Sequence, residues 1–184
     1  MIRIGLIGTN GAGKSTACAY FKEKGFEVFS LSNIIRQECD RLGLEKTREN
    51  LITTGNRLKK EGGQAILAQK AIEFAEKNNI SKIVFDSIRN DEECRTLKKN
   101  HTLLIGIDAP IEIRYKRVKL RNDSTDHVDF ETFRYLEGLE MSGQSSGQYI
   151  ARALEHCQTI ISNDKDETHL HDALSRILET SCQD

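Results

Sequence analysis

The chain is organised around one stretch near its start, Gly8-Thr9-Asn10-Gly11-Ala12-Gly13-Lys14-Ser15, with Thr16 directly after it. This stretch fits G-x-x-x-x-G-K-[ST], the pattern of a phosphate-binding loop (P-loop), and lies in the context that the pattern requires. An apolar, β-branched run precedes it at residues 2–7, and a helix-compatible run follows it at residues 15–22. Because strand, loop and helix agree, a binding loop is favoured over a glycine-rich turn that binds nothing.

Each residue type in this stretch has a physical role in binding phosphate. The glycines let the backbone curl, so that successive N–H groups converge on an anion. The N-terminus of the following helix adds a partial positive charge. Lys14 is expected to reach the outer phosphates of a nucleoside triphosphate, and the Ser15 hydroxyl is expected to bind Mg²⁺.

The composition limits the class of protein. The 184 residues are most simply one domain, and the net charge of −1 argues against a broad nucleic-acid surface. No apolar run approaches the roughly 20 residues that span a bilayer, and the early P-loop strand leaves no room for a signal peptide. The five cysteines are scattered, without C-x-x-C spacing. We therefore expect a cytoplasmic protein with reduced thiols and no membrane segment.

Strand patterns alternate with helical patterns along the whole chain. The strands are expected at residues 2–7, 26–29, 82–86, 102–108 and 159–161. Near-continuous apolar strands of this kind favour a parallel sheet covered on both faces. The predicted fold is α/β, a three-layer α/β/α sandwich around a five-stranded parallel sheet. Its strands would end at a shared edge, where such folds bind ligands, and that edge collects the P-loop, Ser30, Asp86, Asp108 and Asn163.

Two further segments at this edge carry groups suited to phosphate and metal. In Ser30-Leu31-Ser32-Asn33-Ile34-Ile35-Arg36, the spacing puts Asn33 and Arg36 on one helix face. In Asp86-Ser87-Ile88-Arg89, the carboxylate is placed to serve the Mg²⁺ shell and the arginine to grip a phosphate. The alternatives are a solvated, capped helix start for the first segment and a structural Asp–Arg pair for the second.

A basic helix and a late turn complete the set of candidates. Arg114, Arg117 and Arg121 form one stripe, and the polar segment 122–127 after them is typical of a short lid. Arginines on such a segment would stabilise a phosphoryl group during transfer, although a solvated basic face is the alternative, above all for Arg114. Asn163, directly after the last strand, is expected either to lie against a nucleobase or to form an ordinary turn.

Taken together, these motifs resemble the nucleoside monophosphate kinase family. Adenylate-kinase-like enzymes carry S-T-G-D-x-L-R, D-G-F-P-R and R-x-x-x-R in this order, and the chain has Ser30 to Arg36, Asp86 to Arg89 and Arg117-Val118-Lys119-Leu120-Arg121. The resemblance implies an acceptor-binding helical insert at about residues 30–80 and a lid at about 117–147. It implies that Ser30, Asn33, Arg36 and Arg89 bind the acceptor, while Arg117 and Arg121 act on the transferred phosphoryl group.

The sequence after Asp86 is more similar to that of adenylate-kinase-related proteins and dephospho-coenzyme A kinases. Several positions depart from the adenylate kinase pattern. Leu31 and Asn33 replace a threonine and an aspartate, and no acidic residue lies between Ser30 and Arg36. That absence disfavours dephospho-coenzyme A as the acceptor. Glu93 stands at the offset of the glutamine that reads adenine, so bases with amino or ring N–H donors are favoured. Arg134 is the later arginine that would join the lid.

The sequence thus predicts an enzyme that moves the γ-phosphoryl group of ATP to a nucleoside monophosphate or related nucleotide, with Mg²⁺. Lys14, Asp86, Arg117 and Arg121 are the expected catalytic residues, and Ser15 and Asp86 the expected metal residues. Dephospho-coenzyme A or a modified DNA base is the alternative acceptor. A regulatory switch that hydrolyses ATP slowly is the alternative outside kinases. The sequence does not determine the base and sugar of the acceptor or the preference for ATP over GTP. It also leaves open whether the protein is a monomer or a homodimer.

Overall fold

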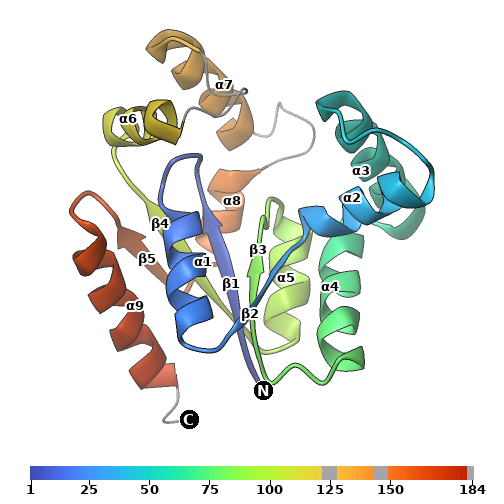
Figure 1. Cartoon of the computed structure of the whole chain (residues 1–184), viewed down its shortest axis with the longest axis horizontal. Helices are drawn as coiled ribbons and strands as arrows, with labels where there is room; N and C mark the ends of the chain where they lie inside the picture. Colours follow the sequence, from blue (N-terminus) through green and yellow to red (C-terminus); the bar gives the residue numbers. More distant parts are fainter. Residues whose placement is uncertain (122–127, 143–148, 182–184) are drawn as a thin grey trace.

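A computed structural model describes residues 1–121, 128–142 and 149–181 (Figure 1). At its centre lies a five-stranded sheet in the order β2-β3-β1-β4-β5, in which every neighbouring pair is parallel. The strands are β1 (Ile2–Gly8), β2 (Glu27–Ser30), β3 (Lys82–Asp86), β4 (Thr102–Asp108) and β5 (Thr159–Ser162). The predicted parallel sheet and three-layer α/β/α architecture are confirmed.

The helices lie between the strands in chain order. They are α1 (Lys14–Glu23), α2 (Ser32–Arg41), α3 (Arg48–Gly62), α4 (Ile66–Lys77), α5 (Asp91–Lys99), α6 (Ile111–Arg121), α7 (Phe130–Ser142), α8 (Ile150–Glu155) and α9 (Glu167–Ser181). Helices α1 and α9 lie on one face of the sheet, and α4, α5 and α8 on the other. In the part of the chain that is described, no helix is both long and apolar enough to cross a membrane.

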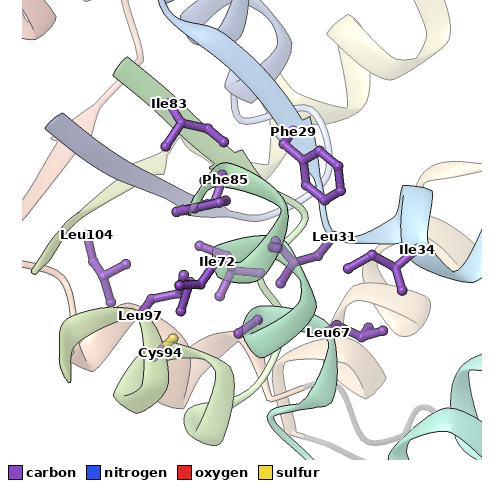
Figure 2. Close-up of a cluster of buried hydrophobic side chains, with 14 of the residues drawn as sticks. Phe29, Leu31, Ile34, Leu67, Ile72, Ile83, Phe85, Cys94, Leu97 and Leu104 are labelled. Carbon is purple, nitrogen blue, oxygen red and sulfur yellow. The ribbon is translucent and has the colours of Figure 1, made fainter. Parts of the chain in front are cut away.

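Successive side chains of a strand point to opposite faces, which is why these apolar strands build two cores. In β3, Ile83 and Phe85 enter the core beneath α4 and α5, whereas Val84 enters the core beneath α1 and α9. Figure 2 shows the first of these cores, where Phe29 of β2, Leu31 at the N-cap of α2 and Ile34 of α2 join two residues of β3, Ile83 and Phe85. A strand buried on both faces has no polar side, which explains the continuous apolar runs in the sequence.

Beyond the carboxyl ends of the strands, two groups of helices extend away from the sheet (Figure 1). Helices α2 and α3 form one group, within the predicted insert at about residues 30–80. The end of α6 and helix α7 form the other, within the predicted lid at about 117–147; residues 122–127 and 143–148 of that lid lie outside the described residues. The P-loop lies between the two groups, at the end of β1.

Candidate active site

The P-loop joins β1 to α1 in a backbone conformation that glycine permits. Gly11 and Gly13 have φ of 76° and 111°, in the region that L-residues with a side chain rarely adopt. Gly13 is the N-cap of α1, and no side chain caps the helix there. The first N–H groups of α1 are therefore not satisfied by a cap, and they point into the loop, as anion binding at a helix N-terminus requires.

Lys14 folds back onto its own loop. Its ammonium donates hydrogen bonds to the carbonyl oxygens of Gly8 and Thr9, both at 2.8 Å. Burial lowers the pKa of Lys14 to about 8, against the negative charge of Asp86, which raises it. The two carbonyl oxygens accept hydrogen bonds that phosphate oxygens would accept in their place. Bound phosphates could therefore replace the carbonyl oxygens without leaving the buried ammonium unpaired.

Residues far along the chain hold the P-loop in place. The Asn163 amide, 5% exposed, donates to the Ala12 carbonyl at 2.8 Å. A Cβ atom built on Gly13 would lie 2.2 Å from that amide nitrogen, and one on Gly11 would lie 2.6 Å from the Arg114 carbonyl oxygen. The predicted contact of Asn163 with a nucleobase stays a prediction, but Asn163 also has a structural role. Its buried amide supports the backbone of the loop.

The end of β3 carries the predicted metal residue. One carboxylate oxygen of Asp86, Oδ2, accepts a hydrogen bond from the Ser87 hydroxyl at 3.0 Å. The other oxygen, Oδ1, is buried and has no hydrogen-bond partner in the described part of the chain. Ser30 donates to Ser87 at 2.9 Å and thereby ties the end of β2 to this turn. A buried carboxylate oxygen without a donor fits a cation or its water shell, so Asp86 suits Mg²⁺.

A cavity of about 580 Å³ opens beside the P-loop, between the two groups of helices. From the predicted acceptor residues, Arg36, Arg89 and Glu93 line it, together with P-loop residue Asn10. Arg36 donates to the Ser32 hydroxyl and, at 3.3 Å, to the Asn33 side-chain oxygen, so Asn33 orients this arginine. The structure therefore brings both predicted phosphate-binding arginines to one cavity that reaches the P-loop.

Glu93 is the deepest charged group on the cavity wall, with an exposed fraction of 1%. Its Oε2 accepts the backbone N–H of Arg89 at 2.8 Å, and its own N–H donates to Asn90, the N-cap of α5. Burial raises the pKa of Glu93, and the Arg89 N–H opposes that rise. Glu93 thus holds the turn that presents Arg89, in addition to the predicted contact with the acceptor.

The arginines of α6 contact the P-loop and its supports. Arg117 donates to the carbonyl oxygens of Asn163, at 2.9 Å, and of Lys165, at 3.3 Å. Arg121 donates to the Asn10 side chain at 2.9 Å. Arg121 thus contacts the P-loop and Arg117 contacts the segment that supports it, and their role in phosphoryl transfer stays a prediction.

The placement of Arg134 on α7 speaks against the expectation that it joins the lid arginines. It is absent from the cavity wall, its side chain is 62% exposed, and its guanidinium pairs with Glu131 at 3.0 Å. Position 134 is one residue after the buried Phe133, so its side chain leaves α7 on another face of the helix. The presence of an arginine at position 134 does not reveal whether its face of the helix is turned toward the cavity or toward solvent.

Two features of the site were not predicted from the sequence, namely the contacts of Arg114 and the position of Glu140. Arg114, 6% exposed, donates to the carbonyl oxygens of Ala109 and Asn10 and forms a bidentate pair with Glu137 of α7. This pair joins the P-loop to α7 through one buried guanidinium. The inner face of α7 also places Glu140 on the cavity wall. The helical spacing of Phe133, Glu137 and Glu140 was the available signal, since residues four and three apart share a face.

Comparisons with known proteins agree with this architecture. A family model described as an AAA domain matches residues 4–140. The UPF0200 protein MJ1399 of Methanocaldococcus jannaschii is 29% identical, over 97% of this chain and 90% of that protein. The UPF0200 protein Mbar_A0975 of Methanosarcina barkeri is 32% identical over 76% of each chain.

Solved structures with the same fold include a shikimate kinase from Bacteroides thetaiotaomicron, with a TM-score of 0.61 and 14% identity over 97% of both chains. The protein TT1252 from Thermus thermophilus superposes with a TM-score of 0.60 and 19% identity, again over 97% of both chains. At these identities the likeness concerns the fold alone.

Proposed function

The chain belongs to the AAA-domain family and to the UPF0200 proteins, and from this premise and the geometry of its site we propose that it is an ATP- and Mg²⁺-dependent phosphotransferase. Its acceptor would be a nucleoside monophosphate or a related nucleotide. The observation that carries the proposal is that Arg36 and Arg89 line one cavity with Asn10 of the P-loop. A second anion site beside a triphosphate loop is what transfer between two phosphorylated molecules requires.

The residues would divide the reaction between them. Lys14 and the P-loop amides would hold the β- and γ-phosphates, and Ser15 with Asp86 would hold Mg²⁺, which supplies charge neutralisation between those phosphates. Arg117 and Arg121 would turn from their carbonyl and amide partners toward the transferred phosphoryl group. Arg36 and Arg89 would bind the acceptor's anionic group with paired N–H donors. Positioning and charge stabilisation would then supply most of the rate.

An acceptor screen tests this proposal directly. The purified protein is incubated with Mg·ATP and either ribo- and deoxynucleoside monophosphates or dephospho-coenzyme A, and ADP release is compared with a blank without acceptor. Shikimate joins the panel because solved shikimate kinases share the fold. Stimulation by one acceptor, lost in Lys14→Ala, is the expected result; normal turnover in that variant would refute the assignment.

The non-kinase candidate, a nucleotide-binding switch, makes a different prediction. A switch hydrolyses ATP without an acceptor and has no second anion to hold, so Arg36→Ala and Arg89→Ala would leave binding and hydrolysis unchanged. In the proposed phosphotransferase the same variants weaken acceptor binding while ATP binding persists. The two arginines on the cavity wall therefore decide between the two functions.

A further inference from the structure

One wall of the cavity is the inner face of α7. Phe133, Leu136, Glu137 and Glu140 lie on it at spacings of three and four, and all four line the cavity. Arg36 and Arg89 line the same space from α2 and from the turn after β3. An acceptor held by the two arginines would therefore meet the carboxylates of α7 within a single cavity.

The other carboxylates around this space are engaged by the protein. Both oxygens of Glu137 accept from Arg114, and Glu93 Oε2 accepts the Arg89 N–H. Asp86 Oδ2 accepts from Ser87, and its buried Oδ1 is the oxygen assigned above to Mg²⁺. Glu140 differs from them: it forms no hydrogen bond or ion pair with any residue that the structure describes, and it is only half-buried.

Glu140 also lies near the group that would hold the transferred phosphate. Its negative charge acts on the Lys14 ammonium and raises the pKa of that lysine, in opposition to the larger lowering by burial. Glu140 thus lines the cavity and acts electrostatically on the P-loop lysine, as a base for the attacking group would have to do.

A free carboxylate at that position suits one kind of attacking atom. A phosphate monoester, with a second pKa of about 6, is already deprotonated at neutral pH. It needs no base, and a neighbouring carboxylate would repel it. A hydroxyl group must lose its proton as it attacks phosphorus, and a positioned carboxylate takes that proton in other phosphotransferases.

We propose that Glu140 accepts the proton of an acceptor hydroxyl, so that the acceptor is an anionic molecule, held by Arg36 and Arg89, that is phosphorylated on oxygen bound to carbon. The hydroxyl oxygen forms a bond to the γ-phosphorus, the bond from that phosphorus to the β–γ bridging oxygen breaks, and ADP leaves. The proton passes to the Glu140 carboxylate. This inference rests on the proposed phosphotransfer and selects, among nucleotide-like acceptors, those that react at a sugar or other hydroxyl.

The experiment separates the two kinds of product by their linkage. The protein is incubated with Mg·ATP and nucleoside monophosphates or dephospho-coenzyme A, each of which carries both an anionic group and hydroxyls. Phosphorus NMR then distinguishes a phosphomonoester, formed on a hydroxyl, from a phosphoanhydride, formed on a phosphate. We expect a monoester. In Glu140→Gln we expect kcat to fall by about 10²- to 10⁴-fold, the usual contribution of a general base, with the Kd for ATP unchanged.

Glu131→Gln is the matched control, because it removes the same charge from the exposed side of the same helix; it should keep full activity. A phosphoanhydride product would overturn the inference and leave the proposed phosphotransferase standing. So would a Glu140→Gln enzyme with kcat within twofold of the wild type. Failure of every acceptor to stimulate ADP release would instead overturn the proposed function, and this inference with it.

Discussion

The two sides of the site, the P-loop and the acceptor cavity, are built in different ways. The P-loop is eight consecutive residues whose binding groups are backbone amides, fixed by Gly11 and Gly13 and held by Asn163. The cavity is lined by side chains from α2, α3, α7 and the turn after β3. The loop would bind any triphosphate through atoms that every residue has, whereas the cavity would bind an acceptor through side chains that can differ without disturbing the fold.

This difference separates general chemistry from specificity. Substitutions that fill space in the P-loop should damage binding and fold together, because the backbone itself is the ligand-binding surface. Substitutions on the cavity wall should change the acceptor or its affinity and spare the fold, since Arg36 and Arg89 are not core residues. Four predictions test that separation, from the largest expected effect to the smallest.

Removal of the Lys14 ammonium should have the largest effect on turnover. In Lys14→Ala we expect kcat to fall by about 10²- to 10³-fold or more, the loss that follows removal of a preorganised charge from a transferring group. Circular dichroism should show an intact fold, because the lysine contacts carbonyl oxygens of its own loop. Steady-state ADP release measures the effect, and wild-type turnover would contradict the role given to Lys14.

A Cβ atom in the loop tests the backbone argument. Gly13→Ala should lower ATP affinity roughly 100-fold, because the new atom would lie 2.2 Å from the Asn163 amide at a φ of 111°. Gly25→Ala is the matched control. Its φ is 81° and its Cβ would meet nothing within 4 Å, so it carries the backbone cost of about 1–2 kcal/mol alone. Calorimetry measures ATP binding by both variants, and thermal unfolding measures their stability. Together they separate the cost of the clash with Asn163 from the backbone cost of a positive φ. Equal losses of ATP affinity in the two variants would refute the role given to the clash.

The cavity arginines should affect the acceptor and spare ATP. Arg36→Ala and Arg89→Ala should each raise KM for the acceptor about 10- to 100-fold, since each removes a charge-assisted hydrogen bond worth about 1.5–3 kcal/mol. Kd for ATP should stay within twofold. Arg134→Ala, on the exposed face of α7, should change neither value. An acceptor effect of Arg134→Ala equal to that of Arg36→Ala would show that the described cavity is not the acceptor site.

The pH dependence of ATP binding gives the smallest effect. The pKa of Lys14 in the free protein is lowered to about 8, and bound phosphates favour its charged form. Below pH 8 the lysine is already protonated, so its titration does not change the affinity for ATP in this range. Above pH 8 binding must take up a proton, and affinity should fall about tenfold per pH unit. Titrations of ATP from pH 7 to 9 measure the slope, which should flatten in Lys14→Arg because arginine stays charged.

The P-loop and the sheet could be predicted from sequence because their signals are local. G-x-x-x-x-G-K-[ST] lies within eight residues, and the apolar strands of a doubly covered parallel sheet show as continuous runs. The predicted meeting of Arg36 and Arg89 also rested on a general rule, since both follow strands that end at one edge of the sheet. That rule predicts the edge of the sheet at which the two arginines lie, and the structure shows a cavity at this edge.

The remainder of the site depended on contacts between segments far apart in the sequence. Asn163 lies at the expected edge, yet its partner is Ala12, about 150 residues away, and only packing turns its amide toward the loop. Arg114 and Glu137 find each other across two helices, and Arg134 misses the cavity by the rotation of one residue on α7. A single sequence specifies which residues share a helix face, but the rotation of that face is set by packing.

Sequence by itself therefore determined the fold class, the P-loop and the edge of the sheet at which the candidate site lies. The tertiary structure alone decided which charges lack a partner among the residues that the structure describes. Glu137 and Glu140 have the same side chain and lie three residues apart, but one is neutralised by a buried arginine and the other faces the cavity. The physical reason is that the state of a carboxylate depends on the groups within a few ångströms of it, and those groups come from elsewhere in the chain.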